Sequence, residues 1–427
     1  MHPNLSFEQA PPISVPYRFF LTAPWFGIAA GLLLLVQGDA LLVSRWAPGT
    51  LALVHLVVAG FMLQAMCGAL LQFIPVATGG NIWRPHWLAA LVHPLLMVAA
   101  GLLVAAFLAQ RPGLFMAAGY TFALGLGFFI VVVSLAVWRT PAQGATVIAL
   151  RIAIAALLVT LATGVTLATG LAKGLLLPLP PLADVHAAWG LGGWALILLA
   201  GVSYFVVPMF QLTPAYPAWF SRGMPWALVA VVGIWSALFP DFSEPLRSIV
   251  LLSGVAVAAS YGAMTLHLHA RRRRKVSDTS FLFFRLAMLS LLLLLLSALI
   301  PLFWEDERIT VWLGVLALFG VFFSVINGML YKIMPFINWL QLQRYYGTRG
   351  TQVLPPNMNQ MLPESRMRIQ FHVHLATLGV LLLAVWVPVL ARPAGLMLML
   401  DCGWLAFNLL QIGLAYRHFK DRVPEAA

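Results

Sequence analysis

Long apolar runs separated by short polar stretches cover almost the whole chain. A helix needs about 20 mostly apolar residues to cross a bilayer, and each run reaches or approaches that length. The pattern therefore predicts an all-α integral membrane protein with twelve transmembrane helices. The expected spans are 20–43, 50–77, 87–109, 114–138, 146–174, 186–210, 223–240, 247–270, 279–303, 309–338, 368–391 and 394–416.

The composition excludes a soluble globular protein, a disordered protein and a solenoid. Of the 427 residues 62% are hydrophobic and only 9% are charged, whereas soluble domains carry about 25% charged residues. The two cysteines, Cys67 and Cys402, both lie in apolar runs, which excludes a disulfide framework. The first 19 residues lack the small-residue cleavage site of a signal peptide, so we expect the first span to be retained.

The net charge of +12 indicates orientation rather than a nucleic-acid partner, because the cations gather in particular loops. They follow the even-numbered spans: Arg84, Arg139, Arg222, Arg271 to Lys275, Arg344, Arg349, Arg366, Arg368, Arg417, Lys420 and Arg422. The loops after odd-numbered spans are poorer in cations and include Glu305, Asp306 and Glu307. The positive-inside rule then places both termini in the cytoplasm.

No soluble domain is expected anywhere in the chain. Residues 1–427 read as one polytopic membrane domain with a single sizeable loop, 339–367, on the cytoplasmic side. This loop is rich in glycine and proline, and we expect an ordered cap or a surface for a partner.

Three of the even-numbered spans share one pattern: two glycines eight residues apart, then a proline seven residues later. The triplets are Gly60, Gly68 and Pro75; Gly193, Gly201 and Pro208; and Gly320, Gly328 and Pro335. They recur about 130 residues apart, and glycines let helix backbones approach closely. The repeat predicts three pseudo-symmetric four-helix units, about 20–138, 146–270 and 279–416, with these spans as the inner helices.

Histidines inside membrane spans are the candidate cofactor ligands, because a buried ionisable group is costly and imidazole binds haem iron and copper. His55 lies early in the second span and His186 opens the sixth, so the two share a side of the membrane. We expect them to be the axial ligands of one haem b. The alternative is a pair of interfacial histidines bonded to carbonyl oxygens or water.

His372 and His374 are two residues apart, and at 100° per residue they point about 200° away from each other. One regular turn therefore cannot present both to a single metal ion, but the two can serve different cofactors. His93, in the third span, lies at the same expected depth, so a second metal site with His372 or His374 is also possible.

Polar residues near the periplasmic rim can support a haem. Arg45 and Trp46 stand just before the second span, where an arginine can bond haem propionates; the alternative is an ordinary interface anchor. Asp184 and Asp401 fall in the same half, and Asp184 can orient a neighbouring imidazole.

Several strings resemble known membrane haem proteins. Residues 186–208, HAAWGLGGWALILLAGVSYFVVP, are similar to the oxidase helix that opens with a copper-ligand histidine and closes on a YYFVP-like turn. HVHLATLG at 372–379 resembles the HVHxxALG signature of C-family oxidases, and His55 resembles their low-spin haem ligand. RFFLTAPWFGIAAGLLLL at 18–35 resembles the NnrS family.

At the level of fold, the whole chain resembles the haem–copper oxidases, the nitric oxide reductases and the NnrS proteins. The resemblance implies three arcs of four helices, histidine-bound haem and, less strongly, copper. The seventh span departs from the oxidase pattern, because WALVAVVGIWSALF lacks the adjacent pair of copper-ligand histidines.

With this resemblance, the sequence predicts a haem-binding protein of the bacterial inner membrane with a redox or nitric-oxide-related role. Its electron donor is unknown, and an oxidoreductase activity is left open. Two alternatives remain open. One is a transporter or permease for a small molecule, a metal or haem, since repeats with Gly/Pro-interrupted helices also occur in transporters. The other is a gas-reducing enzyme with a divergent active site.

Overall fold

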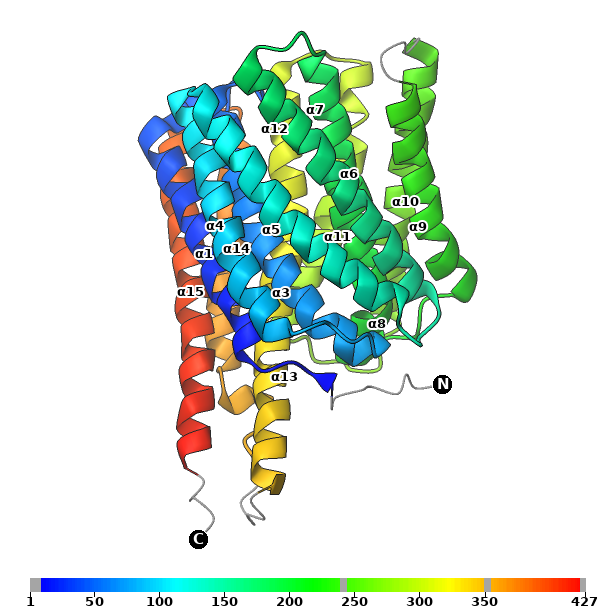
Figure 1. Cartoon of the computed structure of the whole chain (residues 1–427), viewed down its shortest axis with the longest axis vertical. Helices are drawn as coiled ribbons and strands as arrows, with labels where there is room; N and C mark the ends of the chain where they lie inside the picture. The colour runs from blue at the N-terminus through cyan, green and yellow to red at the C-terminus, as the bar shows by residue number, and fades with distance from the viewer. Residues whose placement is uncertain (1–8, 239–243, 349–354, 423–427) are drawn as a thin grey trace. The chain divides into compact units, whose positions relative to one another are not determined.

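A computed structural model describes residues 9–238, 244–348 and 355–422. The described residues are helical, with no strand among them. The described chain divides into two compact units: unit 1 holds residues 9–10, 70–238, 244–275 and 288–309, and unit 2 holds 11–69, 276–287, 310–348 and 355–422. The helices of the whole chain are drawn in Figure 1.

Unit 1 is built from the middle of the chain. Its elements are η4 Ile74–Thr78, α4 Pro85–Ala109, α5 Pro112–Trp138, α6 Ala145–Lys173, α7 Leu179–Ala187, η5 Ala188–Leu196, α8 Ile197–Gln211, α9 Ala218–Ala237, α10 Glu244–Ala270 and η6 Ile300–Leu302. α4, α5 and α6 pack one against the next, and α6 also contacts α8 and α9 (Figure 1).

Unit 2 joins the two ends of the chain. Its elements are α1 Ser14–Gln37, η2 Gly38–Leu41, α2 Pro48–His55, η3 Leu56–Met62, η7 Leu316–Phe323, α13 Ser324–Thr348, η8 Met358–Gln360, α14 Glu364–Ala384, η9 Pro388–Leu390 and α15 Ala391–Asp421. α1 packs along α15, which also contacts α13 and α14 (Figure 1). Three helices cross from one unit to the other: α3 Leu63–Phe73, α11 Thr279–Ser297 and α12 Glu307–Val315.

Eleven helices of the described chain are long and apolar enough to cross a membrane, and each matches one of the twelve expected spans. The remaining expected span, 223–240, corresponds to α9, which is not among the eleven; residues 239 and 240 lie outside the described chain. The first turns of α9 contain Arg222, Gly223 and Pro225, which lower the mean hydropathy of this helix. The multi-pass helical membrane fold is confirmed, whereas the twelfth crossing and the sidedness of the termini stay predictions.

The expected loop 339–367 begins later than predicted, because α13 continues as a helix to Thr348. Leu342 and Tyr346 are buried in a cluster with Met361, and Ala415, Tyr416 and Phe419 of α15 pack against it. The Tyr346 hydroxyl also donates to the carbonyl oxygen of Phe419 at 2.9 Å. This apolar stripe extends the helix beyond the predicted span; residues 349–354 of the loop lie outside the described chain.

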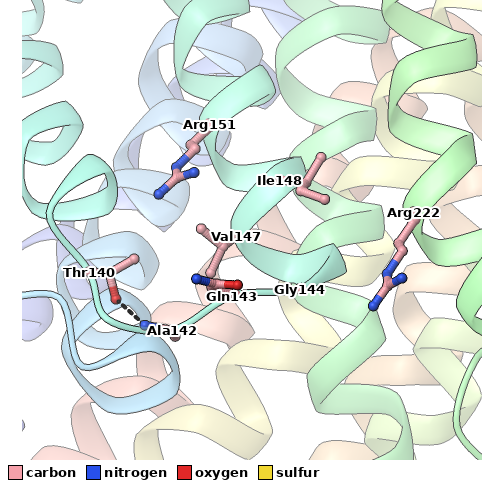
Figure 2. A pocket seen from close by; sticks show the side chains of 8 residues that line it. All are labelled: Thr140, Ala142, Gln143, Gly144, Val147, Ile148, Arg151 and Arg222. Atoms are coloured by element: carbon pink, nitrogen blue, oxygen red, sulfur yellow. Dashed lines mark hydrogen bonds between the residues drawn. The ribbon is translucent and has the colours of Figure 1, made fainter.

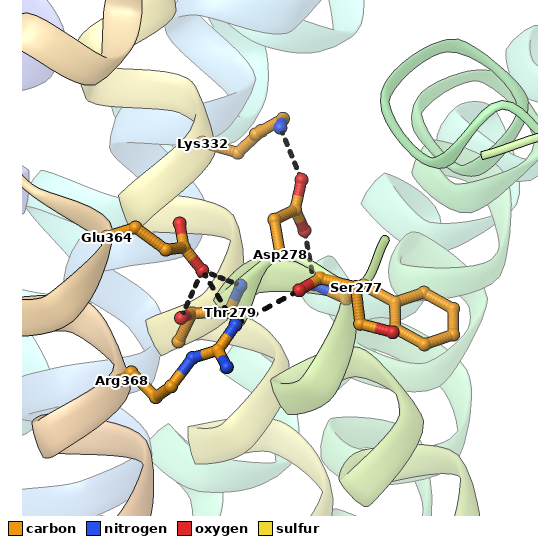
Figure 3. A network of polar contacts seen from close by, with 7 residues as sticks. Ser277, Asp278, Thr279, Lys332, Glu364 and Arg368 are labelled. Carbon is orange, nitrogen blue, oxygen red and sulfur yellow. Dashed lines mark hydrogen bonds and ion pairs between the residues drawn. The ribbon is translucent and has the colours of Figure 1, made fainter. Parts of the chain in front are cut away.

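A polar network fixes the start of α11 within unit 2 (Figure 3). Asp278 caps the helix by accepting from the Phe281 amide at 2.9 Å, and it pairs with Lys332 of α13 at 2.9 Å. Glu364, the first residue of α14, accepts from the amide and the hydroxyl of Thr279, each at 2.6 Å. Carboxylates at a helix N-terminus satisfy its amides and complement its dipole, so this network holds three helices together.

Three π-helical segments lie at matching places in the predicted repeat. They are η3, η5 and η7, and each contains the first glycine of its triplet: Gly60, Gly193 and Gly320. Each of these segments leads into an α-helix that carries the second glycine of its triplet. The sequence pattern had not indicated the π-winding, which is rare and concentrates at functional sites.

The second glycines of the triplets are sites of close packing. A Cβ atom would lie 2.8 Å from Phe19 at Gly68, 2.5 Å from Ala149 at Gly201 and 2.7 Å from Phe283 at Gly328. The three helices therefore share local winding and tight contact at equivalent positions. The grouping of the helices into three four-helix units stays a prediction.

Candidate functional site

Polar side chains lie fully buried among the helices of unit 2. They include Ser324 and Asn327 of α13, Gln370 and His374 of α14, and Asp401 and Asn408 of α15, and none of these six is exposed to solvent. His374 lies ten residues from each end of α14. At 1.5 Å per residue it is about 15 Å from either end of the helix, so the cluster belongs to the middle of the span.

His374 and Asp401 form the centre of this cluster. Nδ1 of His374 lies 2.8 Å from Oδ2 of Asp401, and Gln370 donates from Nε2 to Oδ1 of the same carboxylate at 2.7 Å. An ionised carboxylate only accepts hydrogen bonds, so Nδ1 must carry a proton and Nε2 is the nitrogen whose state can vary. The pair is neutral overall when the imidazole is charged and carries one negative charge when it is not.

The second ring nitrogen of His374 faces the hydroxyl of Ser324 at 2.8 Å. The same hydroxyl lies 3.2 Å from the carbonyl oxygen of Phe319, five residues earlier in the π-helix η7. If Nε2 is unprotonated, the Ser324 hydroxyl donates a hydrogen bond to it. If Nε2 is protonated, Nε2 donates to the Ser324 oxygen, and the hydroxyl donates its own proton to the Phe319 carbonyl oxygen. Both protonation states of the ring thus keep complete hydrogen bonds, because π-winding brings a carbonyl five residues back into reach.

Aromatic rings enclose the imidazole of His374. The Phe319 ring stacks on it with centroids 4.4 Å apart, and Phe283 and Phe323 lie at 5.2 Å and 6.4 Å. These rings keep the surroundings apolar, which strengthens the electrostatic interaction between His374 and Asp401. A metal ion at Nε2 would require the Ser324 hydroxyl to turn away, so the prediction that His374 binds a metal requires a rearrangement.

Further buried amides lie near the pair without complete partners. Among the described residues, both polar atoms of Asn327 lack a hydrogen-bond partner, as do Oε1 of Gln370 and Oδ1 of Asn408. Asn408 donates from Nδ2 to the hydroxyl of Tyr331 at 2.8 Å. Unsatisfied buried polar atoms are costly and rare in native proteins, so each calls for a partner such as a water molecule or an ion, or for a functional role.

The predicted divergence of His372 and His374 is confirmed. His374 is fully buried, whereas His372 is exposed on the other side of α14 and contacts the ring of Phe371. The two side chains therefore do not converge on one metal ion.

His55 ends α2 and is followed directly by the π-helix η3. Its Nδ1 lies 2.7 Å from the carbonyl oxygen of Leu51. A carbonyl accepts only, so Nδ1 carries the proton and the neutral ring has its lone pair on Nε2. In the loop that precedes α2, the guanidinium of Arg45 lies over the Trp46 ring, 4.2 Å from its centroid.

His186 has a similar environment in unit 1. It stands on α7, two residues before the π-helix η5, and its Nδ1 lies 3.1 Å from the Thr160 carbonyl oxygen and 3.1 Å from the Thr163 hydroxyl. Here too the carbonyl makes Nδ1 the protonated nitrogen. Gly164 allows the close approach of this ring, because a Cβ there would lie 3.0 Å from its Cε1.

The expected ligands fall in both units. His55, His372 and His374 belong to unit 2, and His93 of α4 and His186 belong to unit 1. The pairing of His55 with His186, and the second site that joins His93 to α14, therefore stay predictions. Within the described chain no group of three or more His, Cys, Asp or Glu side chains is arranged to hold a metal ion.

Sequence reasoning missed Ser324 and Gln370 and did not pair Asp401 with His374. One signal was available, since Gln370 and His374 are four residues apart and so share a face of α14. No pattern in the sequence pairs α14 with α15 or reveals the π-helix that positions Ser324.

Comparison with models of known protein families gives no match for this chain. Comparison with curated proteins also gives none.

Proposed function

We propose that this chain is a multi-pass membrane redox protein that binds haem through His55 and His186, in the inner membrane of a bacterium. The observation that carries the proposal is the shared setting of these two histidines. Each stands within two residues of a π-helix that contains a repeat glycine, and in each a backbone carbonyl holds the proton on Nδ1.

This setting fits an iron ligand. A ligating histidine commonly donates its other ring N–H to a carbonyl or carboxylate, which fixes the ring and makes the ligating nitrogen more basic. His55 and His186 would supply Nε2 to the iron, and Arg45 would bond a propionate by charge-assisted hydrogen bonds. When bound, a haem would supply the iron that accepts and returns one electron. A nitric-oxide-related role belongs to the same proposal and rests on the resemblance alone.

The test is the visible absorption spectrum of the purified protein, oxidised and reduced. We expect a Soret band and the sharp bands of a reduced low-spin haem in the wild-type protein. His55→Ala and His186→Ala should each lose most of this signal, because a methyl group cannot donate a lone pair to iron. The exposed His418, near the end of α15, offers a matched control, and His418→Ala should keep the full spectrum.

Added imidazole should restore part of the signal in the His55 and His186 variants if each has lost only a ligand. The proposal is wrong if the wild-type protein, expressed with ample haem, has no Soret band. The pairing is wrong if both variants retain an unchanged spectrum.

A second candidate function is proton-coupled transport of a small solute or ion, favoured by the His374–Asp401 pair. Ionisable residues in mid-span are rare, and they commonly act in proton relays of transporters. The Ser324 hydroxyl can bond the imidazole in either protonation state. In liposomes we expect Asp401→Asn to abolish proton uptake that wild-type protein supports under an imposed pH gradient. Equal uptake by both proteins would remove this candidate.

A further inference from the structure

A cavity of about 510 Å³ opens in unit 1 beside the turn between α5 and α6 (Figure 2). Thr140 and Gln143 of the turn, Arg151 of α6 and Arg222 of α9 line it, with Val147 and Ile148 on its apolar side. The eight lining residues include two arginines and no acidic side chain. The cavity therefore has a positive potential.

Both arginines have N–H groups that make no hydrogen bond within the described chain. Arg151 directs Nε and Nη2 to one acceptor, the Val137 carbonyl oxygen, at 3.4 Å and 3.3 Å, which are long distances for hydrogen bonds. Its Nη1 has no acceptor among the described residues. Arg222 is exposed, and the described chain offers its guanidinium neither an acidic partner nor a hydrogen-bond acceptor. Figure 2 draws both arginines among the residues that line the cavity.

The start of α6 adds further donors to the cavity. Gly144 precedes the helix with a φ of +126°, and no side chain caps the first amides. The first turn of α6 contains no acidic residue. A helix N-terminus carries about half a positive charge and presents unpaired N–H groups, so it favours an anion. At Gly144 a Cβ atom would meet nothing within 4 Å, so the approach to these amides is open.

We propose that this cavity binds a phosphate group through Arg151, Arg222 and the N-terminal amides of α6. Arginine presents planar paired donors that match phosphate oxygens, and two arginines can neutralise a dianion. The cavity lies where two membrane-crossing helices end, and its apolar side adjoins the polar donors. A phospholipid headgroup and a free inorganic or organic phosphate share this chemistry.

The experiment compares the wild-type protein with Arg222→Gln, Arg151→Gln and the double variant. One arm measures retention of phosphatidylglycerol against phosphatidylcholine after detergent washing, by mass spectrometry of the intact protein. The other arm measures binding of inorganic phosphate by calorimetry. Each lost charge-assisted bond should weaken binding about tenfold or more, and the double variant should lose it.

Arg139→Gln is the matched control, because Arg139 lies in the same turn but does not line the cavity. Arg151 also contacts Val137, so Arg222→Gln keeps the test valid if Arg151→Gln fails to fold. Selective loss of phosphatidylglycerol would identify a lipid headgroup, and loss of phosphate binding would identify a free phosphate. The proposal is overturned if the double variant and Arg139→Gln bind both probes as the wild-type protein does.

Discussion

Asp401→Ala is expected to lower the free energy of unfolding by about 3–5 kcal/mol, the usual cost of removing one partner of a buried ion pair. The substitution removes the acceptor of both His374 Nδ1 and Gln370 Nε2, and all three side chains are fully buried. The measurement is the midpoint of unfolding in a detergent titration, followed by circular dichroism.

Asp39→Ala is the matched control, because Asp39 is exposed, and its effect should stay within about 0.5 kcal/mol. A double replacement, His374→Leu with Asp401→Leu, should cost less than the two single changes added together, since neither member of the pair would stay buried without the other. If Asp401→Ala unfolds at the wild-type midpoint, the His374–Asp401 pair makes no net contribution to the free energy of unfolding, and this prediction is wrong.

The apolar periodicity was sufficient to predict the helices, because the bilayer leaves few alternatives to a span of apolar residues. It placed the end of α13 at residue 338, ten residues early, because the contacts of Leu342 and Tyr346 with α15 depend on tertiary packing. The π-winding of η3, η5 and η7 was also not predictable, since it depends on how a helix accommodates its neighbours. The repeat glycines nevertheless marked these places.

The candidate site was predictable only in part. The position of His374 in a span and its divergence from His372 follow from helix geometry, and both are confirmed. Its partner could not be predicted, because Asp401 lies 27 residues away on another helix and meets His374 only through the packing of α14 against α15. Ser324 reaches the ring from a third helix.

That packing depends on a second contact of α15, its crossing with α1. Gly27 lies against Cys402, and Gly31 lies against Gly395 and Met399, so the two helices run antiparallel. A Cβ atom at Gly395 would overlap the backbone nitrogen of Leu35 and lie 2.7 Å from the Gly31 carbonyl oxygen. Backbone atoms cannot turn aside as a flexible side chain can, so only glycine fits this crossing.

Gly395→Leu is therefore expected to cost at least about 3 kcal/mol, at the upper end of the range for overpacked sites. Gly403 lies further along the same helix, where an added Cβ atom would have nothing within 4 Å, so Gly403→Leu should be nearly neutral. Both unfolding midpoints can be measured in the same detergent titration. Equal midpoints for the two variants would contradict the close crossing.

Gly395→Leu should also disturb the His374–Asp401 pair, because Asp401 lies six residues further along α15. If α15 is pushed from α1, the 2.8 Å contact between His374 and Asp401 is strained or lost. Adding Asp401→Ala to Gly395→Leu should then cost less than it costs in the wild-type protein. Full additivity of the two effects would show that the crossing and the pair are independent, and that another contact holds α15 against α14.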